Sequence, residues 1–83
     1  MVKTLYFAGL REALGVAGEE IALPPTVGDV AALRAHLAAR GEPWAALATT
    51  RNLRAAVNQR MAAESAAVRD GDEVAFFPPV TGG

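Results

Sequence analysis

Cysteine is absent from this 83-residue sequence, and histidine occurs only once. Without cysteine the chain has no disulfide framework, no thiolate metal site, no iron–sulfur cluster and no cysteine nucleophile. A single histidine also argues against a histidine-based zinc site. We therefore expect no metal site in this chain.

The sequence also lacks an excess of either charge and any long apolar run. Its 8 Lys+Arg and 9 Asp+Glu residues give a formal net charge of −1, without a basic run, which argues against nucleic-acid binding. No apolar stretch approaches the ~20 residues that cross a bilayer, and charges at Arg11 and Glu12 interrupt any signal-peptide pattern. We expect a cytoplasmic protein that binds neither nucleic acid nor membrane.

The residues that are present suffice for one small domain. Apolar residues make up 52% of the sequence, but 19 of them are alanine, so large side chains for a core are few. A domain of this length buries only about 60% of the surface of its unfolded chain. We therefore expect little room for a deep active site within the chain.

Four segments rich in β-branched, aromatic or alternating residues predict strands, over residues 2–8, 19–23, 53–58 and 73–77. Glycines between the first two strands favour a hairpin, with at most one helical turn over residues 11–14. The Asp-Gly-Asp sequence at residues 70–72 predicts a turn before the last strand. The alanine-rich segment 61–68 fits no single pattern and carries no prediction.

One main helix is predicted over residues 28–40. Apolar residues recur along one face of this segment, at Val30, Leu33 and Leu37. Thr26, with Asp29 three residues later, resembles a capping box at its start, and Gly41 is placed to end it. A shorter helix is expected over residues 42–48. The order of these elements, β-β-α-α-β-β, predicts an α+β fold.

Side chains on the first and last predicted strands alternate between two faces. One face carries the charged residues Lys3 and Glu73, so we expect the helix to cover the other face. The apolar residues Leu5, Phe7 and Phe77 then lie on the uncovered face, where they would form a partner site. The alternative is that a loop folds over them as a second small core.

The chain ends in Pro-Pro-Val-Thr-Gly-Gly, directly after the last predicted strand. Two prolines hold this segment extended, and the six residues after Phe77 reach about 20 Å. Glycine passes through channels where a Cβ would clash, so the carboxylate of Gly83 can be presented to another protein. The alternative is a frayed terminus without function. The chain has no phosphate-binding glycine loop, so any chemistry at this carboxylate depends on another enzyme.

Three segments of the chain, Val2–Glu12, Ala55–Gln59 and Asp70–Gly83, carry a resemblance to a known family. The sequence resembles the small, sulfur-carrying subunits of molybdopterin synthase. This resemblance implies a ubiquitin-like β-grasp fold, with a mixed sheet and one main helix packed on one face. It also implies a body over residues 1–77, with parallel first and last strands in mid-sheet, and an extended tail over residues 78–83.

The resemblance further implies a chemical cycle at Gly83. An E1-like adenylyltransferase would join the Gly83 carboxylate to AMP, using ATP and magnesium, and a sulfur donor enzyme would then leave a C-terminal thiocarboxylate. The large synthase subunit, in a heterotetramer of two small and two large subunits, would pass the sulfur to cyclic pyranopterin monophosphate. On this interpretation the chain binds no cofactor and is a non-catalytic subunit, with the active site on the large subunit.

The resemblance also assigns expected roles to particular residues. Four residues would enter the partner's channel ahead of Gly83, namely Pro79, Val80, Thr81 and Gly82. Four others match positions that contact the partners, namely Phe7, Arg11, Met61 and Phe77. Three functions remain as alternatives: a sulfur carrier for the thiamine thiazole, a ubiquitin-like modifier of lysines, and an interaction module with an idle tail. Three scattered arginines suggest only a solvated surface, namely Arg51, Arg54 and Arg60.

Overall fold

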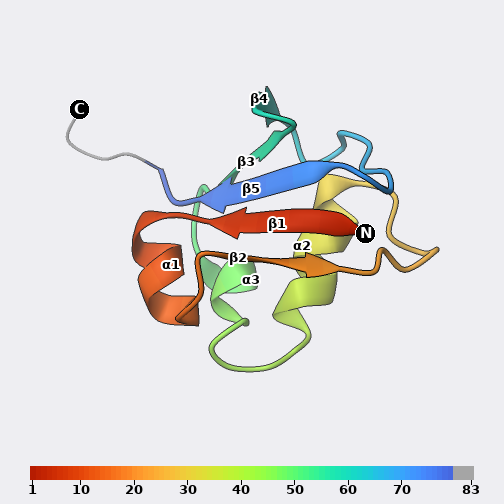
Figure 1. Cartoon of the computed structure of the whole chain (residues 1–83). Helices are drawn as coiled ribbons and strands as arrows, with labels where there is room; N and C mark the ends of the chain where they lie inside the picture. Colours follow the sequence, from red (N-terminus) through yellow and green to blue (C-terminus); the bar gives the residue numbers. More distant parts are fainter. Residues whose placement is uncertain (80–83) are drawn as a thin grey trace.

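The computed structural model describes residues 1–79. Along the chain the elements are β1 (Val2–Tyr6), α1 (Ala8–Leu14), β2 (Gly18–Ile21), α2 (Val30–Ala38), α3 (Ala46–Thr49), β3 (Arg54–Val57), β4 (Arg60–Ala62) and β5 (Glu73–Phe77). The strands form one sheet in the order β2-β1-β5-β3-β4, and Figure 1 shows α2 and α3 behind its strands. The α+β prediction is confirmed.

The first and last strands lie side by side in the middle of the sheet (Figure 1). They run parallel, with Lys3 beside Glu73 and Tyr6 beside Phe76, whereas each of the other strand pairs is antiparallel. Parallel neighbours need a long crossover, and here the crossover includes α2. This mixed sheet with a helix packed across it is the ubiquitin-like β-grasp fold, as expected.

The main helix α2 is shorter than predicted and begins at a different cap. The expected cap at Thr26 is wrong: Asp29 is the cap, because its side chain accepts a hydrogen bond of 2.8 Å from the backbone N–H of Ala32. The predicted end at Gly41 is too late, because α2 ends at Ala38 with Ala39 as its cap, and Gly41 follows two residues later with a φ of +88° that favours glycine. The apolar face packs into the core through three buried residues, Val30, Leu33 and Leu37.

The segment after β1 is a helix rather than the end of a strand. The predicted strand 2–8 stops at Tyr6, and the single turn expected at 11–14 is the seven-residue helix α1. Two apolar side chains explain this helix, because Leu10 and Leu14 are buried in the core. Strands β1 and β2 do pair antiparallel, as predicted, but α1 connects them instead of a tight glycine turn.

The segment 61–68, which carries no prediction, overlaps the edge strand β4. Asn58 and Gln59 connect it to β3, with φ values of 50° and 67°. Two consecutive residues of positive φ form the kind of turn that matches the twist of a hairpin. Strand β4 has three residues, and short edge strands limit pairing with other chains.

None of the helices within residues 1–79 has the length and apolarity to span a membrane.

The core lies between the sheet and the helices. Alternate residues of the two central strands point into it and are buried, namely Val2, Thr4, Tyr6, Val74 and Phe76. The ring of Tyr6 stacks on that of Phe76 at a centroid distance of 6.5 Å and meets the edge of Trp44 at 5.5 Å. The intervening residues of the same strands point to the opposite face, which the helices leave uncovered.

Candidate functional site

A shallow depression of about 280 Å³ lies on the uncovered face of the sheet. Residues from β1, β5, β3 and the ends of these strands line it, namely Leu5, Phe7, Ala56, Gln59, Glu73, Ala75 and Phe77. We call it the open-face depression. Five of these seven side chains are apolar, so the depression suits an apolar side chain of a partner protein.

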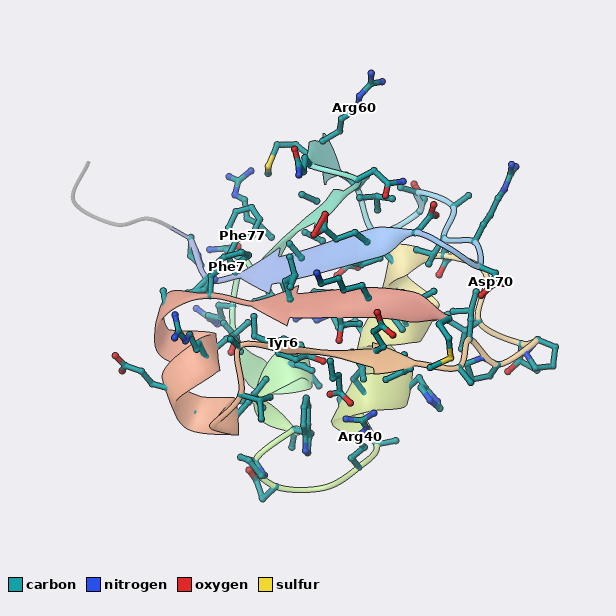
Figure 2. All side chains as sticks on the ribbon, in the orientation of Figure 1. Tyr6, Phe7, Arg40, Arg60, Asp70 and Phe77 are labelled. Carbon is teal, nitrogen blue, oxygen red and sulfur yellow. The ribbon has the colours of Figure 1, made fainter. Side chains whose placement is uncertain are left out.

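Two phenylalanines form the end of this depression next to the C-terminal end of β5. The backbone N–H of Phe7 donates a hydrogen bond of 3.2 Å to the carbonyl oxygen of Phe76, which sets Phe7 beside Phe77. Figure 2 shows the two labelled side chains at the same end of the central strands. Phe7 is 47% exposed, so the uncovered face is confirmed and the alternative of a second small core is wrong.

Met61 and Pro79 line a second hollow, of about 340 Å³, on the β3–β4 side. Met61 pairs with Ala56 across the β3–β4 ladder, so its side chain lies on the open face, and it is 61% exposed. Pro79 follows β5 at the point where the predicted tail begins. The structure thus places Met61 beside the open-face depression and next to the start of the tail.

Arg11 lies one helical turn after Phe7, and its backbone N–H donates to the carbonyl oxygen of Phe7 at 3.4 Å. It belongs to α1 and lines a different hollow, together with Ala8, Glu12, Gly15, Val16 and Ala17. Its guanidinium makes no ion pair within residues 1–79. Arg11 does not line the open-face depression. Its expected role in partner binding remains a prediction.

The tail residues expected to carry the chemistry, Val80, Thr81, Gly82 and Gly83, lie outside the described residues. Strand β5 ends at Phe77, and Pro78 and Pro79 follow it. The division into a body over residues 1–77 and a tail over residues 78–83 therefore stays a prediction.

Within residues 1–79, no group of three His, Cys, Asp or Glu side chains is arranged to hold a metal ion.

A polar network that runs from two buried hydroxyl groups to the surface supports the central strands from the covered side. The phenol of Tyr6 donates to the carboxylate of Glu19 at 3.2 Å, and its oxygen lies 2.9 Å from the hydroxyl oxygen of Thr4. Arg40 donates to the same Glu19 carboxylate at 2.8 Å and stacks over the ring of Trp44. Figure 2 shows Tyr6 on β1 and Arg40 on the helical side of the sheet.

The network changes the proton affinities of its members. Burial is the main cause that raises the pKa of Tyr6 to about 12. The hydrogen bond to Glu19 is the main cause that raises the pKa of Arg40 above its ordinary value. At neutral pH both groups therefore stay protonated and donate to Glu19, which fixes β1 against β2 and the end of α2.

Sequence reasoning missed two kinds of residue in this region. It did not identify the network, because its members are far apart in sequence and no local pattern joins them. It also did not place Arg54 and Ala56 on the open face. Strand alternation separates them from Ala55, but it is the burial of Ala55 in the structure that shows which of the two faces is open.

A family model and two known proteins match nearly the whole chain. The model of the family described as ThiS matches residues 4–83. The molybdopterin synthase sulfur carrier subunit of Escherichia coli is 49% identical over 84 residues, covering all of both chains. The protein of the same name from Haemophilus influenzae is 43% identical over 83 residues, again covering all of both chains.

Solved structures share the fold. A Pyrococcus furiosus chain, provisionally named molybdopterin converting factor subunit 1, has a TM-score of 0.72 and 31% identity, covering 95% of this chain and 97% of its own. Small archaeal modifier protein 1 of Haloferax volcanii has a TM-score of 0.77 and 23% identity over 95% and 97% of the two chains. A chain in the complex of subunits 1 and 2 of the Helicobacter pylori molybdopterin-converting factor has a TM-score of 0.64 and 24% identity, covering 99% and 97%.

Proposed function

Because the chain belongs to the ThiS family, we propose that it is the sulfur carrier subunit of a molybdopterin synthase. The observation that carries this proposal is the identity of 43% and 49%, over the full length, with two carrier subunits of that enzyme. The open face supports it, because a carrier needs a surface for docking and this face ends where the tail begins.

The proposed chemistry takes place at the Gly83 carboxylate. A carboxylate oxygen attacks the α-phosphorus of ATP in an E1-like adenylyltransferase, which supplies the magnesium site, and pyrophosphate leaves. Hydrosulfide released by a donor enzyme then attacks the acyl carbon, the bond to AMP breaks, and a thiocarboxylate remains after loss of a proton. Its sulfur is nucleophilic near neutral pH, so the transfer to cyclic pyranopterin monophosphate requires no cysteine in this chain.

The chain's own residues bind and position rather than catalyse. Phe7, Phe77 and Met61 offer apolar contacts to the large subunit, and Arg11 adds a charged contact at a second place. Val80, Thr81 and Gly82 carry Gly83 into the active site of the large subunit, in an assembly of two small and two large subunits in the cytoplasm. The adenylyltransferase uses the same open face, so the two partners compete for this chain.

The fold by itself does not separate a carrier from a modifier of lysines, since a chain named as a modifier protein shares it. A carrier for the thiamine thiazole also remains an alternative, because the same end, Gly82-Gly83, suits that role. Full-length identity to two carriers of molybdopterin synthase favours the proposed function over both.

The test is intact-mass spectrometry of the chain incubated with the adenylyltransferase, ATP, magnesium and a sulfur source, followed by addition of the large subunit and the pterin precursor. We expect one oxygen-to-sulfur exchange and then formation of molybdopterin. Deletion of Gly83, or one residue added after it, abolishes both with unchanged thermal unfolding. His36→Ala, at an exposed position of α2, is the control with an intact end.

The alternatives predict other outcomes of the same experiment. A modifier forms conjugates with lysines in place of a stable thiocarboxylate, and a thiamine carrier acquires sulfur but yields no molybdopterin. An interaction module with an idle tail shows no mass change. Normal molybdopterin formation by the chain without Gly83 would contradict the proposed role of this residue.

A further inference from the structure

Arg54, at the start of β3, lies on the open face directly beside Phe77. In the β3–β5 ladder Arg54 pairs with Phe77, and the next residue, Ala55, is buried on the covered side. Side chains of neighbouring strand residues point to opposite faces, so Arg54 shares the open face with Ala56 and Phe77. Arg54 is exposed and lines the same hollow as Pro79.

The charge of Arg54 is not balanced by the part of the chain that the structure describes. Within residues 1–79 its guanidinium makes no ion pair. Glu64, the acidic residue among those that line this hollow, is bound instead by Arg34. At the other end of β5 the situation differs, because Glu73 pairs in register with Lys3 on the same face. The open face therefore carries an unbalanced positive charge at the end where the tail begins.

This position has a consequence for docking, which rests on the proposed function. A partner that covers Phe7 and Phe77 and also receives the tail necessarily covers Arg54. A guanidinium stays charged in proteins, and burying it without an acceptor is unfavourable. We propose that Arg54 is a specificity-determining residue, and that the large subunit of the synthase places a carboxylate against it when the two chains dock.

Arg60 provides a matched control for this proposal. It is also an exposed arginine, on β4, and it pairs with Val57 rather than with a residue of the open face. Alternation along β3 puts Val57 on the same side as Ala55, so Arg60 lies opposite Met61. Figure 2 shows the side chain of Arg60 projecting away from Phe7 and Phe77. A change of charge at Arg60 alters the net charge equally but not the open face.

The experiment measures binding of the full-length chain to the large subunit by titration calorimetry, at low and at physiological salt. We expect about tenfold weaker binding for Arg54→Gln and about 100-fold weaker binding for Arg54→Glu, because a docked charge pair is lost or reversed. Arg60→Gln and Arg60→Glu stay within about threefold of the wild type. Salt weakens binding of the wild type more than that of Arg54→Gln. Thermal unfolding of each variant checks that the fold is intact.

A reversal of charge on the partner gives the sharpest readout. Changing the facing carboxylate of the large subunit to lysine restores binding of Arg54→Glu and weakens binding of the wild type. Equal binding by the wild type and Arg54→Gln overturns this inference alone. Tighter binding by Arg54→Gln also overturns it and indicates that Arg54 holds a group of its own chain, such as the terminal carboxylate. Absence of binding by the wild type overturns the proposed function, and this inference with it.

Discussion

Phe76 and Phe77 are identical neighbours at the end of β5, yet they lie on opposite faces of the sheet. Phe76 is 1% exposed and packs under Tyr6, whereas Phe77 is half-buried at the edge of the open-face depression. The same contrast holds at the end of β1, between its last residue Tyr6, which is 1% exposed, and the next residue Phe7, which is 47% exposed. In β1 and β5, the side chains on the covered face thus stabilise the fold, and the side chains on the open face are available to partners.

The two faces also differ in their polar groups. On the covered side the hydroxyls of Thr4 and Tyr6 are satisfied within the chain through Glu19. On the open side Arg54 makes no ion pair within residues 1–79. A face that serves stability satisfies its own polar groups, whereas a face that serves binding leaves groups for a partner to satisfy. This difference supports the assignment of the open face to docking.

Alanine substitution at the two phenylalanines gives the largest expected contrast. Phe76→Ala leaves a cavity beside Tyr6 and lowers the free energy of unfolding by about 3–5 kcal/mol. Phe77→Ala removes a half-buried side chain and lowers it by about 1 kcal/mol. Urea unfolding of both variants measures the difference.

The same pair of variants tests the docking face. Phe77→Ala weakens binding to the large subunit by about tenfold or more, as expected for an aromatic contact in an interface. If Phe77→Ala destabilised the chain as much as Phe76→Ala and bound normally, the proposed division between the two faces would be wrong. Ala75 lies on the same face of β5, and Ala75→Gly serves as a control for backbone effects.

Tyr6→Phe has a smaller expected effect, on the covered side of the sheet. The variant loses the hydrogen bond to Glu19, and the free energy of unfolding falls by about 1 kcal/mol at pH 7. The pKa of Tyr6 is raised to about 12 from 10.0, so the unfolded chain loses this proton first as the pH rises. The stability due to Tyr6 is therefore complete below pH 10 and is lost as the pH approaches 12.

Unfolding curves of the wild type and Tyr6→Phe between pH 9 and pH 12 check this prediction. The difference in stability between the two proteins should shrink over that range, because only the wild type carries the phenol. A constant difference would mean that Tyr6 has the same pKa in the folded and unfolded chains.

Asp72, in the turn before β5, gives the smallest expected effect. Hydrogen bonds from the side chain of Asn58 and the backbone N–H of Arg69 hold the pKa of this carboxyl below its ordinary value. A carboxylate with a lowered pKa stabilises the fold above about pH 4, and this contribution is lost as the pH falls further. Asp72→Asn should cost less than about 1 kcal/mol at pH 7.

The measurement for Asp72→Asn is urea unfolding at pH 7 and at pH 3. The difference between the variant and the wild type should be smaller at pH 3 than at pH 7, because the wild-type carboxyl gains its proton as the pH falls. A larger difference at pH 3 than at pH 7 would contradict the assigned direction of the shift.

Much of the fold and part of the site followed from local patterns in the sequence. Alternation in β1 and β5 correctly put Phe7 and Phe77 on the uncovered face, and apolar recurrence located α2. The strand β4 was missed because its three residues are too few to show alternation, and the alanines that follow favour a helix over a strand. The cap at Asp29 was missed because the capping-box pattern at Thr26 competes with it, and packing of α2 decided between them.

The polar network and the position of Arg54 could not be found in the same way. Tyr6 and Glu19 are 13 residues apart, and Glu19 and Arg40 are 21 residues apart, so no local period relates them. Arg54 is one of several scattered arginines in the sequence. Only the pairing of β3 with β5 places it beside Phe77.

The amino-acid sequence alone defines which side chains share a face of each strand, because alternation is a property of the extended backbone. It also determined the family, through the full-length match and the Pro-Pro-Val-Thr-Gly-Gly end. The choice of neighbouring strands, and of the face that the helices cover, depends on the folded chain, because these contacts join residues far apart in the sequence. The pairing of β3 with β5, and no local pattern, places the positive charge of Arg54 where the tail begins.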